Sequence, residues 1–142
     1  MSVAFTPLLA AHVVVAVVGL GSILAVAIVS AAGRRATHPE AAIAALGPLL
    51  RGGVVSLAIM VVTGVAIDVA MRGAFQARWW FRLSLVLTVV IGAMHAVARR
   101  TVRQMAAADG TATRLRRVER IAYGMCILVA LITVLMVVKP FR

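Results

Sequence analysis

The chain has 142 residues, of which 63% are hydrophobic, and it carries a formal net charge of +11. Soluble globular domains are usually about 45–50% apolar, so this composition predicts an integral membrane protein. The positive charge does not predict nucleic-acid binding, because the basic residues lie mainly in loops and at helix ends, where membrane lipids with anionic headgroups are the expected partners. Cys126 is the single cysteine, which excludes an intrachain disulfide and a cysteine-based metal site.

Four apolar segments make up most of the sequence, at about residues 8–32, 52–71, 80–98 and 121–139. Each is long enough to cross a hydrocarbon core about 30 Å thick at about 1.5 Å per residue. The first is too long for the apolar h-region of a signal peptide and lacks a clear cleavage site, so we expect it to be retained as a helix. The expected fold class is all-α, an integral membrane four-helix bundle formed by a single domain, 1–142.

The first two connections contain recognisable signals. Thr37-His38-Pro39-Glu40 predicts a turn that opens a short amphipathic helix at the membrane interface, and Gly47-Pro48 predicts its end. The second connection, 72–78, is followed by Trp79-Trp80-Phe81-Arg82. Paired tryptophans beside an apolar segment are typical of an interfacial aromatic belt, so the third helix should begin there.

The third connection, 101–120, is rich in arginine and predicts helical extensions of the third and fourth spans, joined by a turn at Asp109-Gly110. With four spans, the first and third connections share one side of the membrane. That side has ten arginines, at positions 34, 35, 51, 99, 100, 103, 114, 116, 117 and 120, and the other side has five basic residues, Arg72, Arg78, Arg82, Lys139 and Arg142. The positive-inside rule then predicts both termini on the non-cytoplasmic side.

Ionisable residues within membrane segments are expensive and usually have a partner. With this topology His12, Asp68 and Arg82 all lie near the outer face, together with Arg72 and Arg78. His95 lies 13 residues after Arg82, about 20 Å deeper at the helical rise per residue. His12 and His95 therefore cannot both bind the iron of one haem. A haem on either histidine would have that histidine as its sole protein ligand, or would need a second ligand from elsewhere, such as Met94, Met125, a homo-oligomer partner or another subunit.

Two interpretations of the outer cluster remain open. The arginines are suited to binding carboxylates and the rings of Trp79, Trp80 and Phe81 to covering a flat apolar face, which together fit a porphyrin with two propionates. Alternatively, Asp68 pairs with Arg72 or Arg82 and His12 bonds a carbonyl, with no ligand. His95 has a similar alternative, in which it extends toward the headgroups beside Arg99 and Arg100.

Several short motifs resemble one superfamily of membrane proteins. They are Leu8-Leu9-Ala10-Ala11-His12, Thr63-Gly64, Trp80-Phe81-Arg82-Leu83, His95 near the end of the third span, and Val137-Val138-Lys139-Pro140-Phe141. In this order they resemble small four-helix membrane proteins that include the protoporphyrinogen IX oxidase of bacterial haem synthesis, the membrane domain of copper-resistance protein D and uncharacterised relatives.

The resemblance implies haem b as cofactor, His12 as the residue that binds the metal, and the bacterial cytoplasmic membrane as location. In the oxidase a lysine opening the third helix is also expected to matter, and Arg82 stands at that position. An arginine cannot lose its proton as a desolvated lysine can, so the difference favours a relative of the oxidase that keeps a site for anions.

Two main functions follow. The first is a protein that binds b-type haem or porphyrin at His12, with Arg82 and Arg78 as propionate partners and His95 as a further candidate ligand, for electron transfer or porphyrin oxidation. The second is a cofactor-free accessory subunit of a homo-oligomer or larger membrane complex. A transporter using Asp68 is less favoured, because the sequence has neither an inverted repeat nor a ring of like residues.

Overall fold

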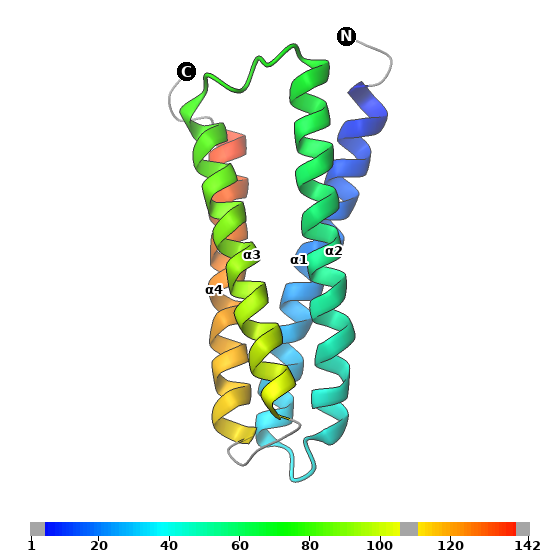
Figure 1. Ribbon diagram of the computed structural model, residues 1–142, viewed down its shortest axis with the longest axis vertical. Helices are drawn as coiled ribbons and strands as arrows, with labels where there is room; N and C mark the ends of the chain where they lie inside the picture. The colour runs from blue at the N-terminus through cyan, green and yellow to red at the C-terminus, as the bar shows by residue number, and fades with distance from the viewer. Residues whose placement is uncertain (1–4, 106–110, 139–142) are drawn as a thin grey trace.

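The computed structural model describes residues 5–105 and 111–138, and every regular element within them is a helix (Figure 1). The helices are α1 Phe5–Arg35, α2 Glu40–Ala70, α3 Trp79–Met105 and α4 Thr111–Val138. Each helix runs antiparallel to the next, and the packed pairs are α1 with α2, α2 with α3, α3 with α4, and α4 with α1. The predicted all-α four-helix bundle is therefore confirmed.

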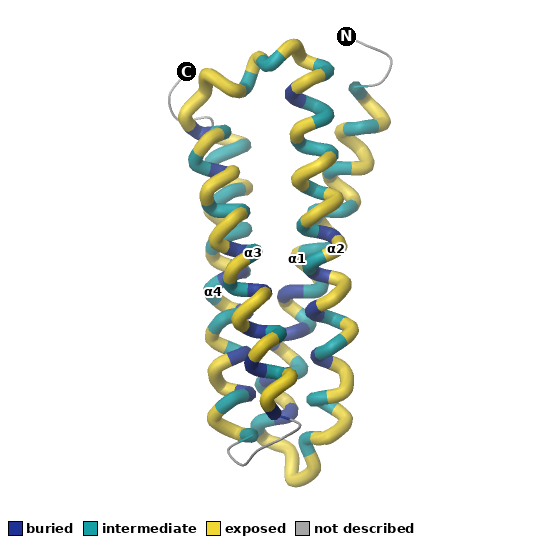
Figure 2. The backbone as a smooth tube through the Cα atoms, in the orientation of Figure 1, coloured by how far each residue is buried: buried dark blue, intermediate teal, exposed yellow. Residues whose placement is uncertain are grey.

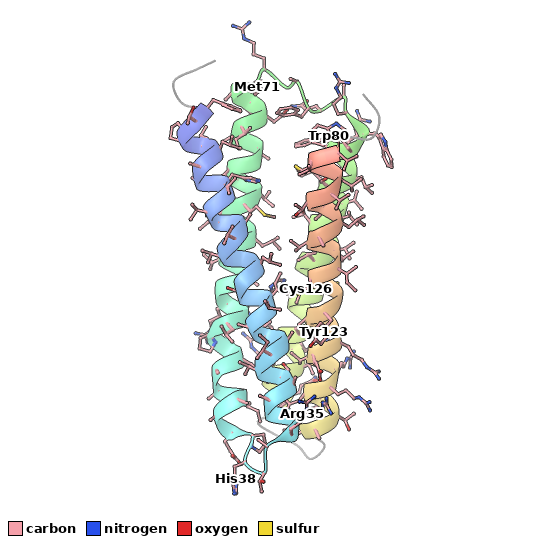
Figure 3. The ribbon with its side chains drawn as sticks, turned by 180° about the vertical axis from the view of Figure 1, so that it is seen from behind. Arg35, His38, Met71, Trp80, Tyr123 and Cys126 are labelled. Carbon is pink, nitrogen blue, oxygen red and sulfur yellow. The ribbon has the colours of Figure 1, made fainter. Side chains whose placement is uncertain are left out.

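The two ends of the bundle carry different parts of the chain. At the terminal end lie Phe5, Val138 and the connection between α2 and α3, with Met71 and Trp80 on either side of it (Figure 3). At the opposite end lie Arg35 and His38, the end of α3 and the beginning of α4. We call this second end the arginine-rich end, because the ten arginines of the first and third connections lie in its half of the bundle.

All four helices are long and apolar enough to cross a membrane. Large apolar side chains cover their outer surfaces, with Val14 61% exposed, Val89 72% and Val137 76%. A surface of this kind is favourable in contact with lipid and unfavourable in contact with water. Soluble proteins expose much smaller apolar patches. The chain is therefore an integral membrane protein, as its composition predicts.

The core is concentrated in the arginine-rich half of the bundle (Figure 2). Within the described residues, α1 has no buried side chain before Ile23 and α4 has none after Met125. Toward the terminal end the α1–α2 pair separates from the α3–α4 pair, which is visible from both sides of the molecule (Figures 1 and 3). One half of the bundle therefore holds most of the buried residues, and the half that contains His12 holds few, among them Asp68, Trp80 and Ser84.

The predicted interfacial helix ending at Gly47-Pro48 is wrong, because α2 continues through both residues as one helix from Glu40 to Ala70. A proline inside a helix removes one hydrogen bond and costs about 3 kcal/mol or more. The uninterrupted helix buries Leu46 and Leu50 completely in the core, and this burial offsets much of that cost. Local sequence predicted a break, and tertiary packing overrides it.

The other predicted elements agree with the structure where it describes them. The four apolar segments lie within the four helices, and α3 and α4 extend beyond them to Met105 and from Thr111, as expected for helical extensions. The predicted turn at Asp109-Gly110 and the end of the fourth segment at Lys139 lie outside the described residues.

Small residues set the distance between α1 and α2. A β-carbon added to Gly33 would lie 2.7 Å from the β-carbon of Ala42, and one added to Gly19 would lie 3.3 Å from that of Ser56. Separations below about 3 Å are far inside van der Waals contact, so the helices can approach this closely only with glycine at position 33.

We expect Gly33→Ala to destabilise the protein by about 1–3 kcal/mol, because the added methyl group overpacks the contact with Ala42. The matched control is Gly21→Ala on the same helix, where an added β-carbon meets nothing within 4 Å. Reversible unfolding in detergent, followed by circular dichroism, measures both. Equal stability of the two variants would contradict the close contact between α1 and α2.

Candidate functional site

His12 lies in the second turn of α1 and contacts α2. Its Nδ1 lies 2.8 Å from the Thr63 hydroxyl, which donates its proton to the carbonyl of Ile59 at 2.8 Å or of Met60 at 3.1 Å. A hydroxyl has one proton, so when Thr63 donates to a carbonyl of α2 it accepts from His12, and Nδ1–H is then the donor. In that tautomer the neutral imidazole has its lone pair on Nε2.

The ring of His12 packs on α2. It is half-buried and lies against Gly64, where an added β-carbon would be 3.4 Å from Cε1. Within residues 5–105 and 111–138, its hydrogen-bond partners are the Thr63 hydroxyl, at Nδ1, and the backbone carbonyl of Met60. A metal-binding histidine is usually held by such a contact at one ring nitrogen while the other nitrogen binds the metal.

Within the described residues Asp68 does not pair with an arginine, so the predicted pairing with Arg72 or Arg82 is wrong. Its carboxylate, only 3% exposed, accepts hydrogen bonds from the backbone N–H of Phe75 at 3.0 Å and from Gln76 Nε2 at 2.9 Å. The helix ends at Ala70, and Arg72 has a positive φ of 58°, so the i, i+4 geometry needed for an Asp68–Arg72 pair does not exist. Asp68 instead holds the connection between α2 and α3 in place.

The arginines of the terminal end are exposed, and one of them bonds to this network. Arg82 donates from Nε to the backbone carbonyl of Gln76 at 2.9 Å, and its side chain is exposed. Arg72 and Arg78 are exposed as well. Gln76 therefore links Asp68 to Arg82, and the three arginines lie at the same end of the bundle as His12.

The aromatic residues at this end pack with one another. The Phe75 ring centroid is 5.7 Å from that of Trp80 and 6.2 Å from that of Phe81, and the Trp80 and Phe81 rings meet edge to face at 6.1 Å. Trp80 is buried, whereas Trp79 is 49% exposed. The cluster joins the connection to the beginning of α3, so Phe75 is part of the aromatic surface that sequence reasoning assigned to positions 79–81.

His95 is buried, with 2% of its surface exposed, and its Nδ1 lies 3.1 Å from the carbonyl oxygen of Ile91. Its Nε2 faces the backbone of α2, where a β-carbon added to Gly53 would lie only 2.6 Å away. A haem iron would bind about 2 Å from the nitrogen, and the porphyrin ring around the iron would need further space. The packing against Gly53 leaves no such space.

The two histidines lie in different layers of the bundle. His12 contacts Gly64 and His95 contacts Gly53, positions eleven residues apart on α2 and therefore about 16 Å apart along the helix axis. Met94 precedes His95 and packs against Gly124, and Met125 is fully buried in the core, so neither lies in the layer of His12. Among the described residues, no group of three or more histidine, cysteine or acidic side chains could hold a metal ion.

The partners of His12 and Asp68 were not predicted from sequence. In the sequence Thr63 belongs to the motif Thr63-Gly64, which does not predict a partner for it. Its role follows from the register of α1 against α2, which places it opposite His12. Gln76 carried no signal beyond its place in a short polar connection. No protein-family model, curated protein or solved structure matches this chain.

We expect Asp68→Ala to loosen the connection between α2 and α3, because the backbone N–H of Phe75 and the side chain of Gln76 lose their acceptor. Limited trypsin digestion in detergent measures this, since Arg72 and Arg78 provide cleavage sites in the connection. The rate should rise about tenfold, as expected for a loss of about 1–3 kcal/mol at a buried acceptor. Glu40→Ala, which removes an exposed carboxylate at the opposite end, is the control, and equal rates in both variants would argue against the role of Asp68.

Proposed function

We propose that this chain binds a b-type haem or a related porphyrin in the terminal half of the bundle, for electron transfer or porphyrin oxidation, with His12 as the axial ligand. The observation that carries the proposal is the hydrogen bond between His12 Nδ1 and the Thr63 hydroxyl. It fixes the ring on α2, and with the proton on Nδ1 the lone pair of Nε2 would bind the metal.

The chemistry of the surrounding residues supports a propionate-bearing ring. Arg78 and Arg82 lie at the same end as His12 with exposed side chains, and a guanidinium binds a carboxylate through two parallel hydrogen bonds. The cofactor, when bound, would supply one-electron chemistry, and the protein would supply the ligand, the anion contacts and an apolar environment. Arg82 stays protonated, so we assign it charge pairing and no proton transfer.

The packing of the terminal half also favours a ligand there. No side chain of α1 before Ile23 and none of α4 after Met125 is buried, within the described parts of these helices. Most of the core lies in the other half, so a flat apolar ring bound here would disturb few fully buried side chains. The arginine-rich half offers no such place, because its interior is filled by side chains including His95.

We expect the purified protein to show a Soret band and a b-type reduced-minus-oxidised α band, either as isolated or after haem is added. His12→Ala should abolish both, and Thr63→Val should weaken haem binding about 10–100-fold, as is typical when a residue supporting a metal-binding histidine is lost. His38→Ala, an exposed histidine at the opposite end, should bind haem like the unmodified protein. A protein that stays colourless with added haem, or a His12→Ala variant with an unchanged spectrum, would contradict the proposal.

A cofactor-free accessory subunit is the second candidate, supported by one observation. Val13, Val14, Val17 and Val18 form a strongly exposed apolar surface on α1, beside the loosely packed half of the bundle, where another membrane chain could pack. Purification in a mild detergent distinguishes the candidates: a colourless protein that carries stoichiometric partner chains supports the subunit, and a haem-containing protein without partners supports the first proposal.

We also propose that the arginine-rich end faces the cytoplasm of a bacterial cell and that both termini face outward. The positive-inside rule supports this orientation, because this end has ten of the fifteen basic residues. Trypsin added outside intact spheroplasts should then cleave the connection at Arg72 or Arg78 and leave Arg35 intact until the membrane is permeabilised. Cleavage at Arg35 first would reverse the assignment.

A further inference from the structure

Three arginines surround a notch between α2 and α3 in the arginine-rich half of the bundle. The notch has a volume of about 80 Å³ and is lined by Gly47, Leu50 and Arg51 of α2 and by Val102, Arg99 and Arg103 of α3. Arg99 and Arg103 are one helical turn apart and so lie on the same face of α3. Two helices therefore bring three guanidinium groups to one small hollow.

The positive charge of the notch is not neutralised within the described residues. The ion pair found among these residues joins Arg34 to Glu119, at 3.0 Å, and neither residue lines the notch. Asp68 is at the opposite end of the bundle, bonded to Phe75 and Gln76, and Glu40 does not line the notch. Three adjacent positive charges repel one another at the edge of a low-dielectric membrane, and an anion in the notch would relieve this repulsion.

The notch lies at the depth of lipid headgroups. Arg51 lies 19 residues before Ala70, where α2 ends just ahead of Arg72, and this corresponds to about 28 Å along the helix, close to the thickness of the hydrocarbon core. On α3, Arg82 and Arg99 are 17 residues apart, or about 26 Å by the same rise. If Arg72 and Arg82 lie at one membrane surface, Arg51 and Arg99 lie at the other.

The notch also opens toward the lipid. A second hollow, of about 350 Å³, is lined by Ala96, Arg99, Arg100 and Arg103 on the outer surface of α3 and shares two arginines with the notch. At Gly47 an added β-carbon would meet nothing within 4 Å, so the α2 side of the notch is open as well. A molecule in the surrounding bilayer can therefore reach the guanidinium groups from the side.

We propose that this notch binds the phosphate of an anionic phospholipid, with Arg51, Arg99 and Arg103 as its ligands. Guanidinium groups bind phosphate oxygens through paired, charge-assisted hydrogen bonds, and basic pockets between membrane helices are typical sites for anionic headgroups. The volume suits a single phosphate group, and the neighbouring hollow on α3 extends it along the lipid-facing surface.

Native mass spectrometry of the detergent-purified protein tests this with phosphatidylglycerol, phosphatidylcholine and inorganic phosphate as probes. We expect the first phosphatidylglycerol to bind about tenfold more tightly than phosphatidylcholine, and the double variant Arg51→Gln with Arg103→Gln to lose this preference. Gly47→Leu should weaken binding by a similar factor, because its side chain fills the notch and leaves all three arginines in place.

The matched control is Arg116→Gln with Arg117→Gln, which removes two exposed positive charges from the same end without altering the notch. It should keep the preference for phosphatidylglycerol within about twofold. Equal losses in both double variants, or unchanged binding in Gly47→Leu, would overturn the proposal in favour of general charge attraction. Displacement of bound lipid by millimolar inorganic phosphate would likewise overturn the assignment to a lipid and indicate a site for a soluble phosphate.

Discussion

The bilayer requires every polar group within it to find a partner in the protein, and the organisation of this bundle follows from that requirement. The helices satisfy their own backbones, and most hydroxyl groups in the spans bond the carbonyl one turn earlier, as in Ser22 to Val18, Ser84 to Trp80, Thr88 to Ser84 and Thr133 to Val129. Such groups are satisfied locally and do not hold helices together. Contact between helices is left to apolar and small side chains.

His12 and Thr63 depart from this pattern, because their hydrogen bond crosses from α1 to α2 within the apolar spans. Ser30 departs in the opposite sense, since its hydroxyl is completely buried and has no partner in the described residues. Ser30 lies in the closely packed half of α1 and His12 in the loosely packed half. Within the apolar spans this polar contact between two helices is thus found where apolar packing contributes least, whereas the ion pair of Arg34 with Glu119 joins α1 to α4 outside the apolar spans.

Sequence was a sufficient guide to the number and type of the membrane-spanning helices, because hydropathy over about 20 residues is a strong signal in a membrane protein. It was not sufficient at Pro48, where burial of Leu46 and Leu50 favours one continuous helix. It also failed at Asp68, because α2 ends two residues before Arg72. The layers of the histidines could be derived from topology, whereas the partner of each depends on helix register, which no local pattern contains.

The two membrane histidines illustrate how strongly register decides function. Both have Nδ1 within hydrogen-bonding distance of a protein oxygen, the carbonyl of Ile91 for His95 and the hydroxyl of Thr63 for His12. In His95 Nε2 is pressed against the backbone of Gly53, in the filled half of the bundle. His12 is only half-buried and lies in the half where the helix pairs separate. The same side chain is therefore a packing element in one layer and a candidate ligand in the other, and the difference comes from the neighbouring helix.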